Sequence, residues 1–449
     1  MLSILLAASA LALPSEDQCR AAALDPDAAL AQAIGLQGYI YGFPIVDLLR
    51  QQHDETHRVR ADQPVAAPTN RIAIYPGVLT PATQGQLRAA NADTLYLNAW
   101  TDLSHGPVLL DLPELGERYY TLGFFDLYGK PHHLGTRTNG GKAMRYALVG
   151  PSGGEIPAGY EPFRLPTDTA WMLGRIFARD SGDEARALQL AQAMQMRGVA
   201  GDPVSDAQPM KPYDSLLFYA MLNQALKALP PVAGEEALMT AFDTAGFGRN
   251  STFDTAALSP GQMTGLGCAL RVGPQVLLQH GFKPTQTGNG WLSSSAVAAP
   301  GHDHLLRATI AKGGYANEPA ESIYPAAIMD STGQMLDGSN TYRIRFAKGQ
   351  TPPVDAFWSM TPYDRTTLQL TENPLQRYSI GNRTQGLRTN ADGSLDIVLS
   401  HTAPAQGTAN WLPTPAGGYH LVTRMYLPRA EALDGRYVLP VIERLPHNP

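Results

Sequence analysis

The stretch LGTRTNG, at residues 134–140, has a close counterpart in IGNRTQG, at residues 380–386. Each copy follows an apolar, aromatic segment that ends in an aspartate. The first segment, RYYTLGFFDLYG, reaches Asp126, and the second, DAFWSMTPYDRT, reaches Asp364. Short apolar and aromatic runs that are bounded by Gly and Pro predict β-strands. The repeated stretch therefore predicts two related β domains.

Two arginines extend the match between the copies. Arg175 and Arg424 lie at similar distances beyond Arg137 and Arg383, the arginines inside the repeated stretch. An arginine fork can bind a carboxylate through two parallel hydrogen bonds, and a repeated Asp and Arg pair is typical of a structural strut. We therefore expect ion pairs inside each domain: Asp126 with Arg137 or Arg175, and Asp364 with Arg383 or Arg424.

The region between the two β domains has helical periodicity. In SGDEARALQLAQAMQMRG, apolar residues recur at the spacing of one helix face, and SLLFYAMLNQALKAL and GEEALMTAFDTAG continue the pattern. The predicted fold is mainly β with a helical insert: two related antiparallel β-sandwich (jelly-roll-like) domains separated by an α-helical region. The expected boundaries are a signal peptide at 1–12, an N-terminal helical arm at 13–70, a first β-sandwich at 71–180, a helical region at 181–320 and a second β-sandwich at 321–449.

Composition restricts the class of protein. A chain of 449 residues with a net charge of -6 is long enough for several domains and has no basic footprint for nucleic acid. The apolar start MLSILLAASALA predicts an export signal and a periplasmic or secreted location, and no later stretch predicts a membrane span. We expect the two cysteines, Cys19 and Cys268, to stay unpaired, with a disulfide between them as the alternative.

The stretch NADTLY has no counterpart in the second domain, which makes it a candidate binding site. It places Asn91, Asp93, Thr94 and Tyr96 at the entry to a predicted strand. The alternative is a turn in which Asn91 or Asp93 accepts hydrogen bonds from its own backbone, since Asn and Asp favour such turns. Trp411, which is flanked by turn residues, is the tryptophan that we expect to be exposed for ligand binding.

Histidines supply the candidate acids and bases. His132 and His133 follow a proline in a predicted loop, and an imidazole titrates near neutral pH. The stretch GHDHLLRA offers His302 and His304, but one metal ion needs at least a third ligand, so we expect no metal and no cofactor. The chain has no P-loop, dinucleotide-binding glycine motif or His-Glu-x-x-His motif, which disfavours nucleotide-dependent enzymes and zinc proteases.

The two β regions resemble a known pair of families. The stretch RAANADTLYLNAWTDLSHGPVLLDLPELGERYYTLGFFDLYG with LGTRTNG resembles domain of unknown function 1254. The stretches FWSMTPYD, NPLQRYSIGNRTQGLRTNADGSLDIVLS and NWLPTPAGGYHLVTRMYLP resemble domain of unknown function 1214. The resemblance implies two sandwiches with a helical segment between them and implies no established reaction. The family more often has Arg at Ala92, and Asn and an aromatic residue near His132 and His133.

These observations lead to one functional hypothesis and two alternatives. We expect the protein to bind a small polar ligand, a sugar or a carboxylate, in a cleft between the β domains and the helical insert, because domain interfaces often hold such sites. The ligand-binding candidates are Asn91, Asp93, Tyr96 and Trp411. The first alternative is a hydrolase of a glycan or ester with Asp93, His132 or His133 as catalytic residue. The second is a structural or interaction module without catalysis.

Overall fold

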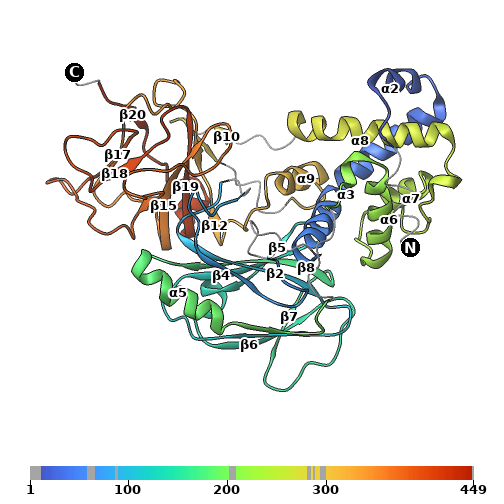
Figure 1. Ribbon diagram of the computed structural model, residues 1–449, viewed down its shortest axis with the longest axis horizontal. Helices are drawn as coiled ribbons and strands as arrows, with labels where there is room; N and C mark the ends of the chain where they lie inside the picture. The colour runs from blue at the N-terminus through green and yellow to red at the C-terminus, as the bar shows by residue number, and fades with distance from the viewer. Residues whose placement is uncertain are drawn as a thin grey trace.

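The computed structural model describes residues 12–57, 66–85, 89–201, 209–280, 285–286, 289–293 and 300–446. These residues form three lobes: a first β unit, a second β unit and a helical unit (Figure 1). The predicted fold class, mainly β with a helical insert, is confirmed. The predicted signal peptide at 1–12 lies outside the described residues except for Ala12. None of the described helices is long and apolar enough to cross a membrane.

The first β unit is a sandwich of two sheets. One sheet has the strand order β1-β2-β8-β4-β5, with bounds Ala73–Val78, Thr94–Asp102, Thr169–Phe177, Tyr120–Asp126 and Pro131–Gly135. The other has the order β7-β6-β3-β9, with bounds Glu161–Arg164, Met144–Val149, Val108–Leu112 and Gln195–Arg197. Helix α5 (Ser181–Ala193) contacts β1, β2 and β8. The structure thus places α5 and β9 with this unit, although the sequence analysis assigned 181–320 to the helical region.

The second β unit repeats this arrangement. One sheet has the order β10-β11-β13-β19-β15-β16, with β12 also paired to β19; the bounds are Thr285–Gln286, Trp291–Ser293, Ala326–Ala327, Tyr419–Pro428, Val354–Asp364, Ile380–Gly381 and, for β12, Ser322–Ile323. The other sheet has the order β18-β17-β14-β20, with bounds Trp411–Pro413, Leu395–Ser400, Tyr342–Phe346 and Ile442–Arg444. The short helix α10 (Ala430–Leu433) follows β19.

Strand pairing shows that the two units have the same topology. In the first unit, Thr121 of β4 pairs with Arg175 of β8 and with Gly135 of β5. In the second, Ser359 of β15 takes the same position, because it pairs with an arginine of β19 and a glycine of β16. The predicted equivalence of the two repeats is confirmed. The sheets are not wholly antiparallel, since β6–β7 and β17–β18 are parallel pairs.

Burial in the strands follows from what covers each face. In β14, Tyr342, Ile344 and Phe346 alternate with two arginines and are fully buried, which is the pattern of a strand with one face in the core. Strand β4 is buried at every position instead. Its inward side chains enter the sandwich core, and on its other face Phe125 packs into the core of the helical unit. The larger sheet of the first unit therefore has no solvent-facing side at this point.

The helical unit joins the N-terminal helices to the insert. It consists of helices α2, α3, α6, α7, α8 and α9 and the 3-10 turns η1 and η2, with bounds Glu16–Ala22, Pro26–His57, Leu217–Ala228, Glu236–Thr244, Pro260–His280, His304–Lys312, Pro212–Asp214 and Thr255–Ala257. Proline removes one helical hydrogen bond and disfavours the interior of a helix, and Pro44 lies inside α3. Helix α3 nevertheless continues to His57. Ile45, Val46 and Leu48 are fully buried in the helical core, and this packing outweighs the local cost of the proline.

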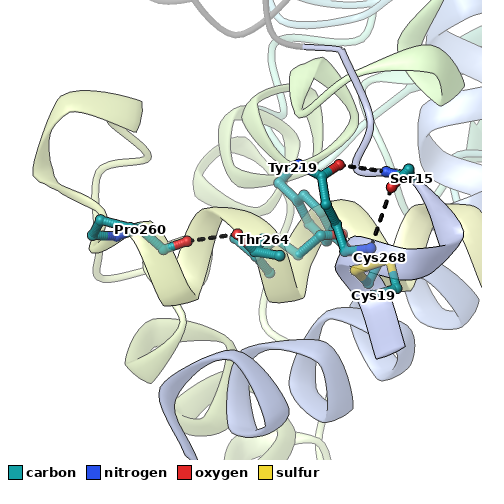
Figure 2. The surroundings of a disulfide bond; sticks show 8 residues. Ser15, Cys19, Tyr219, Pro260, Thr264 and Cys268 are labelled. Atoms are coloured by element: carbon teal, nitrogen blue, oxygen red, sulfur yellow. Dashed lines mark hydrogen bonds between the residues drawn. A yellow bond between two sulfur atoms is a disulfide. The ribbon is translucent and has the colours of Figure 1, made fainter. Parts of the chain in front are cut away.

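A disulfide ties the N-terminal helix α2 to α8 (Figure 2). Cys19 and Cys268 are bonded, with Cα atoms 5.6 Å apart, so the expectation of two unpaired thiols is wrong. The backbone N–H of Cys19 donates to the carbonyl of Ser15 at 3.0 Å, which places the cysteine in the first turn of α2. The bond closes a separation of 249 residues. A chain-entropy treatment assigns about 5 kcal/mol of stabilisation to a loop of this length.

Candidate functional site

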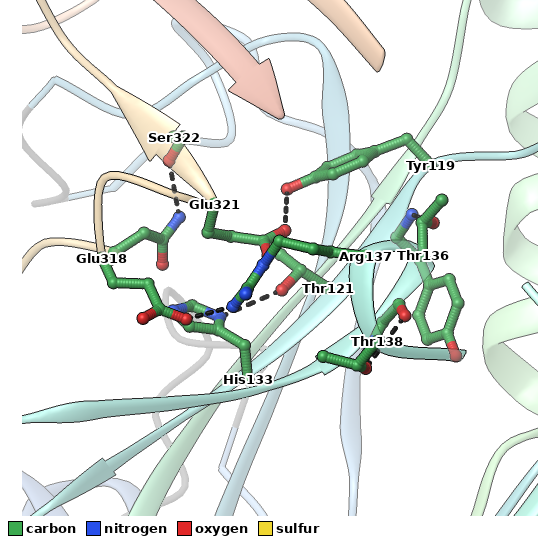
Figure 3. Close-up of polar contacts among 12 residues, drawn as sticks. Tyr119, Thr121, His133, Thr136, Arg137, Thr138, Glu318, Glu321 and Ser322 are labelled. Carbon is green, nitrogen blue, oxygen red and sulfur yellow. Dashed lines mark hydrogen bonds and ion pairs between the residues drawn. The ribbon is translucent and has the colours of Figure 1, made fainter. Parts of the chain in front are cut away.

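The two β units meet at a polar junction centred on Arg137 (Figure 3). Arg137 lies in the short helix α4 (Thr136–Asn139), and its Nε donates to Oε2 of Glu321 at 3.0 Å. It also pairs with Glu318. Only 1% of the Glu321 side chain is exposed, and its other oxygen accepts a hydrogen bond from the Tyr119 hydroxyl at 2.7 Å. Burial, reinforced by the Glu321 charge, raises the pKa of Tyr119 well above its usual value. Arg137 therefore connects the two units.

His133 lies beside this ion pair on β5 and is neutral at pH 7. Its Nδ1 is 3.1 Å from the hydroxyl of Thr121, and its buried Nε2 has no hydrogen-bond partner among the described residues. Burial first, and then the positive charges of Arg137 and Arg175, lower the pKa of His133 to about 3. A base is most effective when its pKa is near the working pH. The predicted acid-base role therefore finds no support at His133.

The predicted binding residues of NADTLY form a second part of the junction. Asn91 accepts hydrogen bonds from the backbone of Asp93 and Thr94, both at 3.0 Å, and donates to the hydroxyl of Tyr426 at 2.7 Å. Its own N–H donates to the hydroxyl of Tyr96 at 3.3 Å. The turn that was the alternative for Asn91 is thus present. These groups are buried and paired with one another, which supports a structural role.

Asp93 extends this network into the second β unit. Its carboxylate accepts hydrogen bonds from the hydroxyls of Ser359 at 2.6 Å and Ser379 at 2.5 Å. Only 8% of the residue is exposed. Because both oxygens are occupied by hydroxyls from the other unit, Asp93 is not placed to act as a catalytic base or to bind a ligand in this structure. Its environment favours the structural alternative for this residue.

The predicted ion pairs inside each domain are wrong for both aspartates. Asp126 accepts hydrogen bonds from the backbone N–H groups of Tyr128 and Lys130, and its Oδ2 lies 3.0 Å from Nε2 of His132. Asp364 accepts from two backbone N–H groups and a hydroxyl within the turn at 364–367. Both aspartates lie where a central strand ends. Stabilising the following turn accounts for their repetition.

The remaining arginines also have partners that the sequence did not predict. Arg424 is buried and donates to the hydroxyls of Thr361 and Tyr363 and to the carbonyl of Ala89. Arg175 donates to Asn317 Oδ1 at 3.3 Å and lies over the ring of Tyr96. Arg383 is exposed and donates to the carbonyl of Ala356 at 3.1 Å. Arg175, Arg383 and Arg424 therefore each have a different set of partners, and none of them pairs with the predicted aspartate.

One predicted candidate, Trp411, and one serine motif that was not predicted from the sequence are excluded by their surroundings. Trp411, expected to be exposed, is 2% exposed, and its indole N–H donates to the carbonyl of Ser400. The stretch GPSGG at 150–154 matches the Gly-x-Ser-x-Gly pattern of serine hydrolases. That pattern requires a strand, a sharp turn and a helix. Ser152 instead lies in an exposed turn after β6, and its hydroxyl donates to Asp168 at 2.7 Å.

A pocket of about 260 Å³ opens beside the junction, between the two β units and α5. We call it the interunit pocket. Its apolar part consists of the rings of Tyr119, Phe177 and Phe357. Its charged part comes from both units and includes Glu117, Arg118, Arg179, Asp183, Asp355 and Arg383. Tyr119 belongs to both sites, because its ring lines the pocket and its hydroxyl donates to Glu321.

The arginines of the interunit pocket differ in what they already bind. Arg118 forms a two-pronged ion pair with Asp183, at 2.8 and 2.6 Å, and lowers the pKa of that carboxyl to about 2. Arg179 makes longer contacts, of 3.7 Å to Asp180 and 3.9 Å to Asp183. Arg383 donates to the carbonyl of Ala356, its guanidinium lies 6.0 Å from the centroid of the Phe177 ring, and it has no carboxylate partner among the described residues. The pocket therefore contains one guanidinium that is available for an anionic group.

Sequence reasoning missed the acidic partners of the junction. Glu318 and Glu321 come from NEPAES, a loop that precedes the second β unit and has no counterpart in the repeat. Two acidic residues just before the second repeat could have been named as candidate ion-pair partners, but nothing in the sequence connects them to Arg137. A pair separated by more than 180 positions depends on how the units dock.

The fold defines a class of protein with two β domains of related topology and a helical unit, and family comparisons agree with this arrangement. Residues 69–198 match the family described as "Protein of unknown function (DUF1254)", and residues 321–430 match "Protein of unknown function (DUF1214)". The chain belongs to the family that pairs these two domains. No curated protein matches it.

One solved structure shows the same fold, and a second match is weaker. The VPA0106 protein from Vibrio parahaemolyticus is similar over 93% of this chain and 100% of its own, with a TM-score of 0.70 and 22% identity. An uncharacterized protein from Burkholderia cenocepacia matches with a TM-score of 0.43 and 14% identity, over 96% of this chain and 98% of its own. At this identity the first likeness concerns the fold alone.

Proposed function

We propose that the protein is an exported binding protein for a small molecule that carries a carboxylate, and that the ligand occupies the interunit pocket. The observation that carries the proposal is Arg383, an arginine on the pocket wall without a carboxylate partner among the described residues. An arginine fork is suited to bind a carboxylate through two hydrogen bonds. Export is supported by the apolar N-terminal sequence and by the disulfide, because disulfides persist in oxidising compartments.

The lining of the pocket favours a ligand with one charged end and one apolar end. Besides its charged groups, the pocket is lined by Tyr119, Phe177 and Phe357, whose rings supply apolar surface. Ligand pockets for drug-sized molecules usually measure about 300–1,000 Å³. A volume of about 260 Å³ therefore fits a small organic acid better than an oligosaccharide. Of the two predicted ligand classes, sugar and carboxylate, the second has the better complement here.

Thermal-shift measurements on the full chain test the proposal. The probes are acetate, butyrate, benzoate and succinate, with glucose as a neutral comparison. A ligand present at 100 times its dissociation constant adds about 2.7 kcal/mol of stability. We expect an acid with an apolar body to stabilise the wild type, the Arg383→Ala variant to lose this effect, and the Arg383→Lys variant to keep part of it.

The control is Arg388→Ala, which removes an exposed arginine five positions along the chain and outside the pocket lining. It should respond to acids as the wild type does. Stabilisation that is equal in Arg383→Ala and wild type contradicts the proposed anchor. Stabilisation by glucose alone contradicts the ligand class. An unresponsive wild type contradicts binding of these acids and favours the structural alternative, which the buried and paired Asp93 already supports.

A further inference from the structure

We propose that Glu235, His302 and His304 form a binding site for a divalent transition metal of the zinc class. Candidate ligand atoms of all three side chains lie within 4.8 Å of one another. Oε1 of Glu235 is 3.0 Å from Nε2 of His304 and 3.3 Å from Nδ1 of His302. From the sequence we expected no metal, because His-x-His lacks a third ligand. The fold supplies that ligand from a residue almost 70 positions earlier.

The separations fit the coordination geometry of zinc. Zinc binds histidine nitrogen and carboxylate oxygen at about 2.0–2.1 Å in a tetrahedral arrangement, which places neighbouring ligand atoms roughly 3.3 Å apart. Glu235 meets both imidazoles close to that separation. Two histidines and one glutamate form a ligand set of the open type, in which a water or another molecule takes the fourth position.

Local structure holds the three side chains in place. Asp303, between the histidines, caps helix α9 by accepting a hydrogen bond from the N–H of Leu306 at 2.9 Å. Glu235 lies immediately before α7, and its Oε2 accepts from the hydroxyl of Tyr41 at 2.8 Å. A hydrogen bond to a metal ligand, such as the one from Tyr41, orients that ligand and tunes its affinity for the metal. Tyr41 also packs edge-on against the ring of His304, with centroids 5.0 Å apart.

The site opens toward solvent on one side. The Glu235 side chain is 3% exposed, His304 is 22% exposed and His302 is 65% exposed. A metal ion could therefore enter past His302 and keep its fourth position accessible. The site lies in the helical unit and shares no residue with the interunit pocket, so the inference is independent of the proposed function.

Arg307 provides a second observation that points to a bound group. Its guanidinium lies over the rings of Tyr41 and Tyr128, with centroid distances of 5.1 and 5.3 Å. The residue is 9% exposed, and its Nε and Nη2 are buried without hydrogen-bond partners among the described residues. An unpaired buried donor costs free energy. Arg307 is three residues after His304 on α9, and we assign it to an oxyanion bound at the fourth metal position.

Metal titration of the intact chain tests the site. The full-length protein is freed of metal with a chelator, dialysed and titrated with Zn²⁺ by calorimetry and with Co²⁺ by visible absorption. We expect one ion per chain and the absorption of a four- or five-coordinate cobalt ion. Inorganic phosphate should shift the cobalt spectrum of the wild type, and this shift should be absent in Arg307→Leu.

Matched variants separate the site from adventitious binding. Tyr41→Phe removes a hydrogen bond to the ligand Glu235 and should weaken metal binding by roughly 10–100-fold. His302→Ala, which removes a largely exposed side chain, and His304→Ala each remove a ligand and should weaken binding by more than that. His280→Ala removes an exposed histidine at the end of α8 and should leave affinity unchanged. Circular dichroism checks that each variant is folded. The proposal is overturned if the wild type does not bind metal stoichiometrically. It is also overturned if folded His302→Ala and His304→Ala bind metal as tightly as the wild type does.

Discussion

The two β units use the same backbone device at the repeated stretch. Gly135 pairs with Thr121 on the neighbouring strand, and Gly381 pairs with Ser359. In each case the N–H of the glycine donates to a threonine hydroxyl three residues later, at 2.9 Å. At both glycines the neighbouring strand leaves no room for a Cβ atom. The hydrogen bond to the threonine hydroxyl closes the turn that follows each glycine. The sequence repeat therefore reflects a repeated piece of backbone structure.

The arginine inside the same stretch differs between the units. Arg137 is tied to Glu321 and Glu318 at the junction, whereas Arg383 lines the interunit pocket and donates to the carbonyl of Ala356. The backbone partners of the repeat come from its own unit, but the acids that bind Arg137 come from a loop outside the repeat. Residues at equivalent positions of the two units thus share their backbone hydrogen bonds, whereas their side chains have different partners.

Replacing the two arginines should give the largest contrast. Arg137→Ala leaves the carboxylate of Glu321 buried without its cation, and breaking a buried pair costs roughly 3–5 kcal/mol. We expect about 3 kcal/mol, at the lower end of that range, because Arg137 itself is about one third exposed. Arg383→Ala should change the free energy of unfolding by less than about 0.5 kcal/mol. Urea unfolding measures both.

The double variant Arg137→Ala with Glu321→Gln serves as the control for this contrast. Removing the buried charge together with its partner should recover part of the lost stability, because the penalty of an unpaired charge disappears. Equal destabilisation by Arg137→Ala and Arg383→Ala would contradict the difference between the units. It would instead restore the expectation that both arginines are structural struts.

Replacing the two glycines should give matching losses. A Cβ added to Gly135 would lie 2.4 Å from the carbonyl oxygen of Tyr120, and a Cβ added to Gly381 would lie 1.9 Å from that of Trp358. Because the atoms in the way are backbone, relief requires the strands to move. We expect Gly135→Ala and Gly381→Ala each to lose about 2–3 kcal/mol in urea unfolding.

Gly386→Ala is a control for the glycine variants. Gly386 ends the second copy of the repeat, and a Cβ there meets no atom within 4 Å, although its φ of +78° adds some strain. Its cost should be about 1 kcal/mol. A large loss at only one of Gly135 and Gly381 would show that the two units do not share this backbone device.

The sequence predicted the repeat because local pattern determines strands and turns. The matched aspartates, Asp126 and Asp364, predicted where two central strands end. Helical periodicity likewise predicted α6 and α7. Each of these signals depends on neighbours within a few residues, and such signals can be read without knowing the tertiary structure.

The candidate site could not be predicted in the same way. Whether Asp93 faces a cleft or meets Ser359 and Ser379 is decided by the docking of the two units. Trp411 was expected to be exposed because turn residues flank it, but it is 2% exposed and its indole N–H donates to the carbonyl of Ser400. Glu235 completes the cluster with His302 and His304 only because the helical unit brings distant segments together. Sequence patterns identify candidate residues, and long-range contacts determine their partners.

His133 allows a test that concerns the first unit alone, since Ser379 takes its position in the second. Its pKa is lowered to about 3 in the folded chain, so the unfolded chain binds more protons below about pH 6.5. The stability that His133 contributes is therefore present above pH 6.5 and is lost as the pH falls toward 3. Between pH 7 and pH 5 we expect a loss of about 2 kcal/mol from this group.

Comparison of variants isolates this contribution from other titrating groups. In His133→Gln the free energy of unfolding should fall about 2 kcal/mol less between pH 7 and pH 5 than in the wild type. His105→Gln, which changes an exposed histidine of the same unit, should follow the wild-type pH dependence. If His133→Gln and wild type have parallel pH profiles, His133 is not held neutral by burial.

The smallest expected effect is also the most direct test of equivalence. Thr138→Ala and Thr384→Ala each remove the hydroxyl that accepts from the N–H of a buried glycine. The bond from the glycine N–H is 2.9 Å long in both units, and losing it should cost about 1 kcal/mol in each. Thr138→Ala also removes the bond that the Thr138 hydroxyl donates to the carbonyl of Gly135 at 3.1 Å, so its loss should be at least as large as that of Thr384→Ala. Replacement by Ser keeps the hydroxyl and should recover most of the loss. A loss in one unit without a loss in the other, or no recovery with Ser, would show that the matched threonines differ in role as the matched arginines do.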